Sequence, residues 1–288
     1  MPELPEVETT VKGLNKKVLN RTFVDVVSDW EKMVKIPKNF DAFKKELKGK
    51  KIKKVWRRAK NVIFELSDGY SLLIHQKMTG HLMVSKWRAE NDKWIPDKRG
   101  PLDEKINLFI HIIFFLDNHE MIALSDLRKF AKVELWKTEE MLKEFEKLGP
   151  EPLDKSFSFK KFKERLAGKR GKVKQVLMNP EIITGIGNIY SNEALWWAKI
   201  NPQKDVSALS EKELKLLYVS IKKVLEAGIR LGGESFSDYR NIYGERGHFD
   251  DERKVYKREK QKCSRCGEII KRLKFGGRSA FFCPKCQA

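Results

Sequence analysis

The sequence predicts an α+β fold in which a leading helix and a β-sandwich domain precede a helical domain and a small four-cysteine module. Three observations support this. Apolar residues recur at helical spacing over the first 20 residues, short β-branched and aromatic runs follow up to about residue 136, and helical patterns resume after a Gly/Pro-rich break. Strands grouped in one part of a chain and helices in another are typical of an α+β protein.

The leading helix is expected from Glu3 to about Asn20. Its apolar positions recur every three or four residues and would form one buried face, comprising Leu4, Val7, Val11, Leu14 and Val18. A helix here would hold the N-terminus rigidly.

The strands are expected where β-branched and aromatic residues cluster between turn residues. These runs are Phe23–Val27, Lys51–Trp56, Val62–Leu66, Ser71–Ile74, Leu108–Leu116, Met121–Leu124 and Lys132–Trp136. The polar stretch from Lys86 to Lys105 interrupts them, and we expect a long exposed loop there.

A breaker-rich segment, Gly149 to Asp154, predicts the domain boundary. Helical patterns then cover Phe159–Ala167, Val173–Met178, Ile189–Ala198 and Glu211–Leu231, and Ser210 is a candidate N-cap for the last of these. We therefore expect residues 1–148 to form the N-terminal domain with its leading helix, 149–250 the helical domain and 251–288 the cysteine module.

The charge balance favours a polyanionic partner. Sixty Lys and Arg face 40 Asp and Glu, which gives a net charge of +20, and basic residues set against phosphates release condensed counterions. Nucleic acid is the first expectation, although basic ribosomal, membrane-surface and thermophilic proteins have similar compositions.

The sequence also predicts where the protein works. Glu3, Glu6 and Glu8 stand where a signal peptide needs a basic and then an apolar run, and the longest apolar stretch is interrupted by His111. We expect an intracellular, cytoplasmic protein. Nothing in the sequence requires an oligomer, so we expect a monomer.

The cysteine spacing predicts a metal site. Cys263, Cys266, Cys283 and Cys286 form two CxxC pairs separated by sixteen residues, which suits four thiolates converging on one zinc ion. Four protein ligands leave no open position, so the zinc is expected to be structural. Residues 251–288 hold twelve Lys or Arg against four Asp or Glu, which indicates that this module lies on phosphates.

The second residue is the candidate nucleophile. If Met1 is removed, as is usual before a small residue, Pro2 has a free secondary amine. Free α-amino groups titrate near about 7.7–8.0 and lysines near about 10.4, so the terminal amine is more often uncharged at neutral pH. Attack of a secondary amine on a sugar aldehyde carbon gives a cationic iminium that favours elimination of phosphates. The alternative is that Pro2 and Pro5 only begin the helix.

Two glycine-containing segments have two interpretations each. Gly185 to Asn188 opens a helical pattern, so it is either an anion-binding turn or an ordinary interhelical turn. The region between Gly232 and Gly247 is either a mobile loop that closes on a ligand or a solvated linker.

Taken in order, these motifs resemble those of the formamidopyrimidine-DNA glycosylases over the whole chain. The motifs are Pro2 to Glu8, Arg57 to Lys60, His75 to Gly80, Asp126 to Phe130, Gly185 to Tyr190 and the C-terminal cysteines. The resemblance implies a helix-two-turns-helix element in the helical domain and a zinc finger at the C-terminus. It implies a bifunctional DNA glycosylase and AP lyase that excises oxidised purines, such as 8-oxoguanine and formamidopyrimidines, from duplex DNA with β,δ-elimination.

The resemblance also implies the role of each site residue. Pro2 would attack the sugar carbon that bears the damaged purine, Glu3 would donate and relay protons, and Lys60 would hold a flanking phosphate and assist catalysis.

The remaining site residues would contact DNA. Met78, Arg128 and Phe130 resemble the side chains that fill the space left by an everted base. The resemblance assigns backbone contacts to His75, Asn188, Tyr256 and Arg278, and a base-covering loop to the segment from Gly233 to about Phe249.

The sequence departs from the family pattern at three positions. Lys77 replaces a small residue before Met78, Ala131 stands where glycine is common, and Glu234 stands where a small hydroxyl residue is frequent. These changes leave the expected chemistry intact, but an added ammonium or carboxylate could change which bases are tolerated.

Three alternatives remain. An enzyme of the endonuclease VIII branch would act on oxidised pyrimidines, although Leu4 argues against it because that branch typically has glycine there. A non-catalytic zinc-dependent protein would bind damaged DNA without cleaving it, and an RNA-binding zinc-ribbon protein would fit the composition but not the N-terminal motif.

Overall fold

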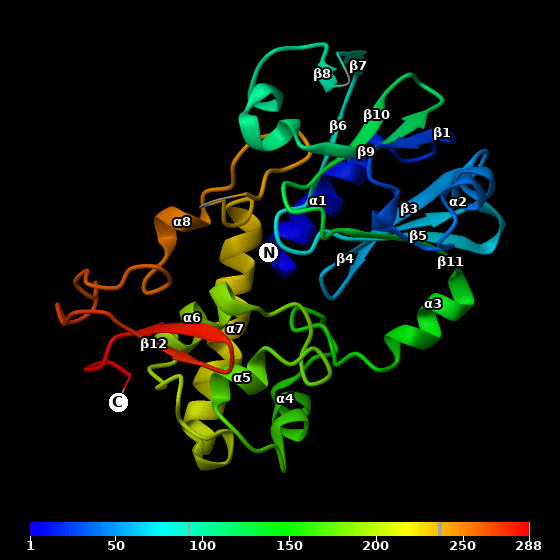
Figure 1. The fold of residues 1–288 in the computed structure, drawn as a ribbon. Coiled ribbons are helices and arrows are strands. Elements are labelled where there is room, and N and C mark those ends of the chain that lie inside the picture. The colour runs from blue at the N-terminus through cyan, green and yellow to red at the C-terminus, as the bar shows by residue number, and fades with distance from the viewer. Residues whose placement is uncertain (92, 236–237, 288) are drawn as a thin grey trace. The chain divides into compact units, whose positions relative to one another are not determined.

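The computed structural model describes residues 1–91, 93–235 and 238–287 (Figure 1). Contacts divide the chain into two compact units. The first comprises Met1–Glu146 with Leu231–His248, and the second comprises Lys147–Arg230 with the residues from Phe249 onward. Residues 231–235 and 238–248 thus pack with the N-terminal part of the chain, and the predicted three-domain division stays a prediction.

The first unit is a β-sandwich with the expected leading helix. Its four-stranded sheet has the order β1-β9-β10-β6, and its five-stranded sheet has the order β2-β11-β5-β4-β3. The strands are β1 Phe23–Ser28, β2 Val34–Ile36, β3 Ile52–Arg58, β4 Asn61–Leu66, β5 Tyr70–His75, β6 His81–Ser85, β9 Ile110–Leu116, β10 Met121–Ser125 and β11 Lys132–Lys137. Its helices are α1 Leu4–Lys17, α2 Phe40–Leu47 and α3 Thr138–Phe145.

Helix α1 packs against both sheets of this unit. It contacts β3 and β4 of one sheet and β6 of the other. Val7, Val11, Leu14 and Val18 are all buried in the same core cluster as the inward-facing residues of the strands. The predicted apolar face is therefore confirmed, and its burial fixes the N-terminus at the sandwich.

The prediction of an exposed loop over Lys86–Lys105 is wrong. A β-hairpin, β7 Trp87–Glu90 paired with β8 Lys93–Pro96, occupies this region and precedes the short 3-10 turns Pro101–Asp103 and Lys105–Leu108. Trp87 is buried with Ile110 and Ile113, and Trp94 packs edge-to-face on Phe115 at 6.1 Å. Two tryptophans in a charged stretch thus supply enough apolar area to hold a hairpin on the sheet.

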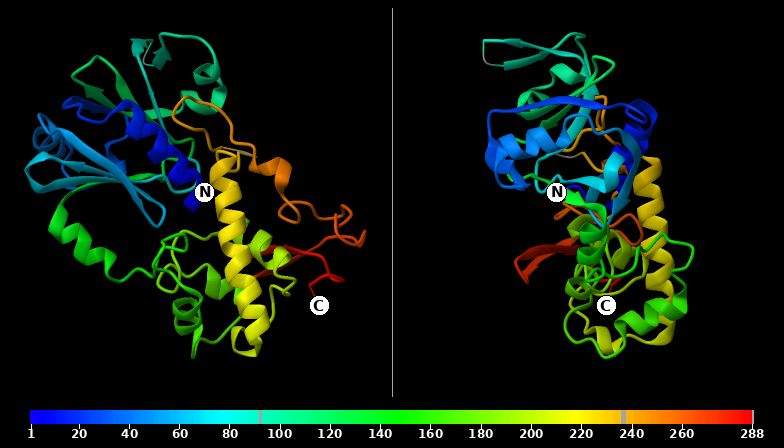
Figure 2. Two further views of the ribbon diagram at one scale, coloured as in Figure 1. Left: turned by 180° about the vertical axis from the view of Figure 1, so that it is seen from behind. Right: turned by 90° about the vertical axis from the view of Figure 1, so that its right-hand side faces the viewer.

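The second unit is helical and carries the C-terminal hairpin. Its elements are α4 Phe159–Leu166, α5 Val173–Leu177, α6 Asn188–Trp197, α7 Glu211–Arg230, α8 Phe249–Glu252, β12 Lys271–Phe275 and β13 Arg278–Phe282. The long helix α7, yellow in Figure 2, packs against α6 and α4. Strand β13 also packs against α6.

The predicted start of α7 is confirmed. Ser210 Oγ accepts a hydrogen bond from the Glu213 N–H at 3.3 Å, and the Ser210 N–H donates to Glu213 Oε2 at 2.9 Å. This reciprocal pair satisfies two backbone donors at the helix N-terminus.

Candidate active site

Pro2 and Glu3 lie at the N-terminal end of α1, and both are buried. Glu3 is 2% exposed, and its backbone N–H donates to Glu6 Oε2 at 2.7 Å across the first turn of the helix. Met1 is 42% exposed. Met1 is joined to the Pro2 nitrogen by a peptide bond. Removal of Met1 would therefore leave a free amine on Pro2, in a buried site.

Glu6 joins this helix end to residues 231–235 and 238–248, which we call the covering segment. Its second oxygen, Oε1, accepts the Glu234 N–H at 2.8 Å, and its backbone carbonyl accepts the Tyr239 hydroxyl at 2.9 Å. The carboxylate is 1% exposed. One buried side chain therefore sets the position of the candidate nucleophile relative to the covering segment.

Lys60 is held at the β3–β4 turn by Arg57. The guanidinium of Arg57 donates from Nε to Glu8 Oε2 on α1 at 3.0 Å, and from Nη1 to the Ala59 carbonyl at 2.9 Å. Ala59 has a φ of 54°, a conformation that non-glycine residues adopt only when the surroundings enforce it. The turn that presents Lys60 is thus clamped to the same helix as Pro2 and Glu3.

His75, at the end of β5, is a neutral hydrogen-bond donor. Burial lowers the pKa of His75 to about 3, and the nearby charges of Lys77 and Lys60 lower it further. Its Nδ1 accepts the Lys77 N–H at 2.9 Å, so the ring proton resides on Nε2. The charge of Lys60 therefore acts on His75.

The two turns that carry the predicted space-filling residues are bound to each other. Asp126 accepts the hydroxyl of Thr79 on one oxygen and the Ala131 N–H at 2.7 Å on the other, and the Arg128 N–H donates to Thr79 Oγ1 at 3.1 Å. A Cβ on Gly80 would lie 2.4 Å from the Gln76 carbonyl, so this close approach requires glycine. The turns 76–80 and 126–131 are therefore bound to each other by these side-chain hydrogen bonds.

Met78, Arg128 and Phe130 project from these turns. Met78 is 40% exposed and Phe130 is 51% exposed, while the Arg128 guanidinium lies 4.6 Å from the Phe130 ring centroid. The three side chains are therefore accessible to a partner on the surface of the first unit.

In the second unit, Asn188 is the first residue of α6 and lies beside a buried lysine. Lys174 is 2% exposed, and its ammonium donates to Asn188 Oδ1. Gly185, with a φ of 80°, begins the turn that brings the chain to this helix end. The turn thus supports the anion-binding interpretation, because a cation and a helix N-terminus meet there.

Tyr256 is positioned by Glu193 of α6. The carboxylate accepts the backbone N–H groups of Lys254, Val255 and Tyr256 at 2.8 to 3.0 Å. Complete burial raises the pKa of Glu193, and these three donors oppose that rise. The Tyr256 ring packs edge-to-face on Phe281 at 5.3 Å, which ties it to the C-terminal hairpin.

Arg278 lies at the exposed β12–β13 turn. A Cβ on Gly276 would lie 2.1 Å from Gln175 Nε2, so the turn rests directly on α5. Because Gln175 follows Lys174, the hairpin turn and the Asn188 site are close together within this unit.

The four cysteines converge as their spacing predicts. Their sulfur atoms all lie within 4.8 Å of one another, and Cys266 Sγ is 3.4 Å from Cys283 Sγ. Zinc–sulfur bonds of about 2.3 Å at tetrahedral angles place sulfur atoms about 3.8 Å apart, so the cluster fits one zinc ion with no open position. The Trp196 indole N–H donates to Cys263 Sγ at 3.4 Å, which links the site to α6.

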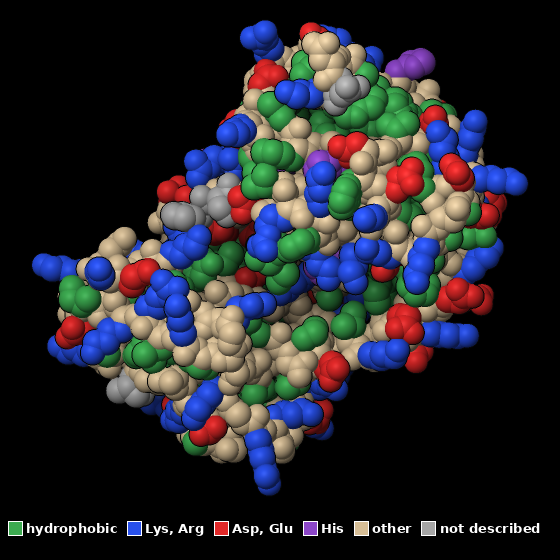
Figure 3. Space-filling view, in the orientation of Figure 1, with side chains coloured by type: hydrophobic (Ala, Val, Ile, Leu, Met, Phe, Trp, Pro, Cys, Tyr) green, Lys and Arg blue, Asp and Glu red, His purple; other side chains and the backbone are tan. Residues whose placement is uncertain are grey.

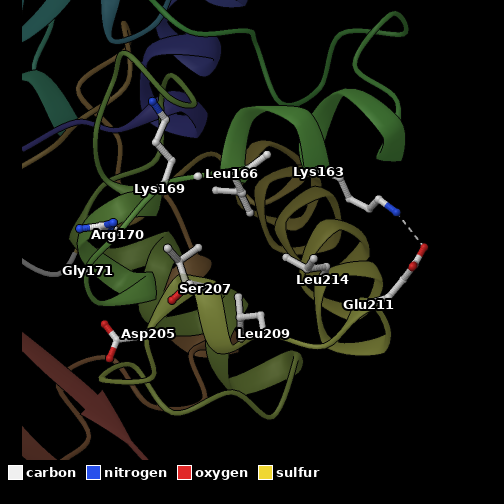
Figure 4. A pocket seen from close by; sticks show the side chains of 13 residues that line it. Lys163, Leu166, Lys169, Arg170, Gly171, Asp205, Ser207, Leu209, Glu211 and Leu214 are labelled. Carbon is white, nitrogen blue, oxygen red and sulfur yellow. Dashed lines mark hydrogen bonds and ion pairs between the residues drawn. The ribbon is translucent and has the colours of Figure 1, made fainter.

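Basic side chains are plentiful on the face drawn in Figure 3. A separate cavity of about 720 Å³ lies among α4, the following loop and the start of α7 (Figure 4). Its rim carries the Lys163–Glu211 ion pair at 2.9 Å. It contains none of the predicted site residues.

The structure distributes the predicted residues over both units. The first unit holds Pro2, Glu3, Lys60, His75, Met78, Arg128 and Phe130, and the second holds Asn188, Tyr256, Arg278 and the four cysteines. Within the first unit, the turns that carry them are fixed to α1 or to each other.

Sequence reasoning did not single out several residues that organise these sites. Glu6, Arg57, Thr79 and Asp126 act through contacts between distant segments, although each lies inside a quoted motif. Lys174 is different, because a lysine in a short helix looks like an exposed residue, and only the structure shows it buried at Asn188. In the part of the chain that the structure describes, no helix is both long and apolar enough to cross a membrane.

Comparison with known families covers most of the chain. The formamidopyrimidine-DNA glycosylase N-terminal domain matches residues 1–133, and the formamidopyrimidine-DNA glycosylase H2TH domain matches residues 148–240. A zinc finger found in FPG and IleRS matches residues 260–288.

Curated relatives match over their whole length. The formamidopyrimidine-DNA glycosylase of Desulfitobacterium hafniense (strain DSM 10664 / DCB-2) is 37% identical, and the match covers 100% of each chain. That of Lactococcus lactis subsp. cremoris is 36% identical, over 100% of this chain and 99% of the relative.

Solved structures of similar proteins contain DNA. The complex of Lactococcus lactis Fpg with abasic-site DNA has a TM-score of 0.86 at 35% identity, covering 99% of both chains. A complex of Lactococcus lactis Fpg with Fapy-dG DNA has a TM-score of 0.85 at the same identity and coverage. With matches of this extent in sequence and structure, the chain belongs to the formamidopyrimidine-DNA glycosylase family.

Proposed function

We propose that this protein is a bifunctional DNA glycosylase and AP lyase of base excision repair, which removes oxidised purines from duplex DNA. The observation that carries the proposal is a buried Pro2–Glu3 pair at the end of a helix to which the Lys60 turn is clamped. Relatives named formamidopyrimidine-DNA glycosylase, and similar proteins solved with Fapy-dG and abasic-site DNA, support it.

The reaction begins at the Pro2 nitrogen after Met1 is removed. The amine lone pair attacks the deoxyribose carbon C1′, and the bond from C1′ to the base breaks with its electrons moving to the base. The Pro2 nitrogen then loses its N–H proton, and the departing base takes up one proton, so that the amine is neutral before the ring opens. Glu3 supplies a proton to the sugar ring oxygen as the ring opens, which gives an iminium on Pro2.

The iminium then drives strand cleavage. Loss of a C2′ proton expels the 3′ phosphate by β-elimination, and loss of a C4′ proton expels the 5′ phosphate by δ-elimination. Water finally hydrolyses the iminium and regenerates the amine. Burial of Pro2 and Glu3 favours these steps because it keeps bulk water away from the reacting atoms.

Lys60 and His75 bind the phosphates next to the lesion. Lys60 supplies a positive charge, while His75 is neutral at physiological pH and donates from Nε2. A neutral donor makes this contact independent of pH over the working range, since the pKa of His75 is about 3.

Met78, Arg128 and Phe130 fill the space that the everted base leaves in the duplex. Their two turns are joined by Thr79 and Asp126, so the three side chains enter the DNA duplex together. Contacts of these side chains with the neighbouring bases offset part of the free energy of unstacking, which is about a few kcal/mol per base step.

Asn188, Tyr256 and Arg278 hold the DNA backbone from the second unit, and Lys174 adds a charge beside Asn188. Zinc bound to Cys263, Cys266, Cys283 and Cys286 supplies the cross-link that holds the finger together. The finger, as a basic module on α5 and α6, presents Arg278 to the DNA.

The covering segment closes over the everted base, and Lys77, Ala131 and Glu234 adjust which bases are accepted. We further propose that the enzyme acts as a monomer in the cytoplasm, on the chromosome. The division into residues 1–148, 149–250 and 251–288 is part of the same proposal.

The test is a comparison of lesions. The purified protein is incubated with duplexes carrying 8-oxoguanine, a formamidopyrimidine or an oxidised pyrimidine, and product ends are separated on a gel. We expect purine excision and products with phosphates on both sides of the gap. A preference for the pyrimidine would assign the enzyme to the endonuclease VIII branch, and binding without scission would make it a damage-binding protein.

Glu3→Gln is the informative variant. It should bind the lesion duplex but lose base excision, because the amide cannot donate and relay the proton. Glu31→Gln, an exposed acid on the short turn Glu31–Met33, is the control and should excise normally. Undiminished excision by Glu3→Gln would show that another group is the proton donor.

A further inference from the structure

The covering segment is fixed by side chains of residues 101–108, a region without an assigned role. The two stretches pass side by side in Figures 1 and 2, where the covering segment is orange and residues 101–108 are blue-green. Both belong to the first unit.

Arg240 makes the first attachment. It is 7% exposed, and both its Nε and its Nη2 lie 2.8 Å from Glu104 Oε2, while its Nη1 donates to the Tyr239 carbonyl at 2.8 Å. A buried guanidinium is tolerated only when it is paired. Glu104 is therefore the partner that lets the chain bury Arg240 here.

Asn107 makes the second attachment. It is fully buried, its Nδ2 donates to the Pro101 carbonyl at 2.7 Å and to the Gly244 carbonyl at 3.1 Å, and its Oδ1 lies 2.8 Å from His81 Nε2. Burial lowers the pKa of His81 to about 4, so the ring is neutral and its Nε2 proton is directed at Asn107. The orientation of the Asn107 amide is thus fully determined.

Gly244 shows how closely the two stretches fit. Its φ is 80°, and a Cβ at this position would lie 2.8 Å from Asn107 Nδ2 and 3.0 Å from Leu102. A side chain here would separate the segment from its support.

A third contact lies between these two. The Ile242 carbonyl accepts a hydrogen bond from the Val84 N–H at 2.9 Å. The Ile242 side chain packs so closely on α1 that a Cβ added to Gly13 would lie 2.7 Å from it. Residues 240, 242 and 244 are thus anchored in succession, and Glu234 is anchored by Glu6 on the other side of positions 236–237.

We propose that Glu104, Asn107 and Arg240 are positioning residues that preset the covering segment over the everted base. The inference deepens the proposed function and rests on it. A segment anchored in advance loses less conformational entropy when it closes on the base. Excision of a base should therefore depend on these residues, whereas cleavage at a preformed abasic site, which has no base to cover, should not.

The test uses the full-length protein and measures single-turnover rates on two duplexes, one with 8-oxoguanine and one with an abasic site. Arg240→Gln should slow base excision about fivefold or more, because it removes the charge from a partly buried pair, and should leave abasic-site cleavage unchanged within about twofold. Arg240→Lys should retain part of the rate because it keeps the charge but only one donor group.

Matched controls separate positioning from stability. Lys44→Gln removes an ion pair of the same unit, Lys44 with Asp25 at 2.9 Å, and should leave both rates unchanged. The double charge reversal of Glu104→Arg with Arg240→Glu should recover part of the rate that either single variant loses.

Hydrogen exchange supplies a readout that does not depend on activity. In the free protein, Arg240→Gln and Asn107→Ala should both accelerate exchange in peptides spanning residues 231–248 and leave peptides from α1 unchanged. Equal losses on the two duplexes, or unaltered exchange in residues 231–248, would overturn the inference. If the unaltered protein fails to excise 8-oxoguanine, the proposed function fails, and exchange still decides whether the anchoring exists.

Discussion

The carboxylate of Glu6 accepts a hydrogen bond from the backbone N–H of Glu234 at 2.8 Å, although the two residues are 228 positions apart. The other oxygen of the same carboxylate holds the Glu3 N–H at 2.7 Å. Gly233 must be glycine beside this contact, since a Cβ there would lie 2.8 Å from Glu6 Cγ. The catalytic end of α1 and the covering segment are therefore positioned by one buried group.

Glu6→Gln tests this link. Glutamine can accept one of the two N–H groups but not both, so one buried donor loses its partner. The free energy of unfolding should fall by about 1–3 kcal/mol, the usual cost of a buried unsatisfied donor. Urea denaturation measures the change, and Glu31→Gln should unfold like the unaltered protein. An unchanged midpoint and slope for Glu6→Gln would mean that the two hydrogen bonds to the Glu6 carboxylate contribute nothing to the free energy of unfolding.

Two histidines, His75 and His81, make the first unit sensitive to acid. Burial lowers the pKa of His81 to about 4, whereas an unfolded histidine titrates near about 6.5. Below pH ~6.5 the unfolded chain binds a proton that the native chain does not, so stability falls until the pH reaches about 4. The effect of His81 is at most about 3 kcal/mol, since each unit of pKa is worth about 1.4 kcal/mol.

His81→Gln isolates this contribution. His75 has a pKa of about 3 and adds to the same trend, so the unaltered protein and the variant must be compared at each pH. The difference between their unfolding free energies should shrink as the pH falls from 7 to 4. Parallel curves would show that His81 titrates normally in the native state.

Removal of zinc should weaken DNA binding rather than the chemistry of Pro2. Chelation, or Cys263→Ser, should disorder the finger, because two of the cysteines belong to the core cluster that includes Trp196 and Phe281. The affinity should fall, and its dependence on salt should become less steep, since fewer phosphates are neutralised. Titrations at several salt concentrations measure both, and unchanged affinity in metal-free protein would contradict a structural role for the metal.

Gln76 offers a stabilising substitution. It is 1% exposed, and neither side-chain polar atom has a hydrogen-bond partner among residues 1–91, 93–235 and 238–287. Gln76→Leu keeps the approximate volume and removes the unsatisfied groups, so the free energy of unfolding should rise by about 1–2 kcal/mol. A decrease of similar size in thermal or urea unfolding would instead reveal an ordered water that binds the amide.

The parts of the fold that local pattern determines were predictable. The apolar face of α1, most strands, the Ser210 cap and the convergence of the cysteines depend on spacing along the chain, and sequence displays spacing directly. The β7–β8 hairpin was missed because its lysines and acids outnumber the two tryptophans that anchor it.

The support of the site was not predictable in the same way. Arg57, Asp126 and Asn107 look like ordinary polar residues in the sequence, and their roles come from hydrogen bonds to partners brought together by sheet pairing and loop packing. Arg240 also looks like an ordinary charged residue in the sequence, and only its contact with Glu104 in the structure explains why it is buried.

The central claim is that the amine of Pro2 forms the covalent bond to DNA. The protein is incubated with an 8-oxoguanine duplex in borohydride, which reduces the iminium, and after nuclease and trypsin digestion the peptide of residues 2–12 is analysed by mass spectrometry. The account predicts that Met1 is absent and that the sugar remnant is attached to Pro2. Fully active protein that retains Met1, or that carries the remnant on Lys60 instead, would contradict it.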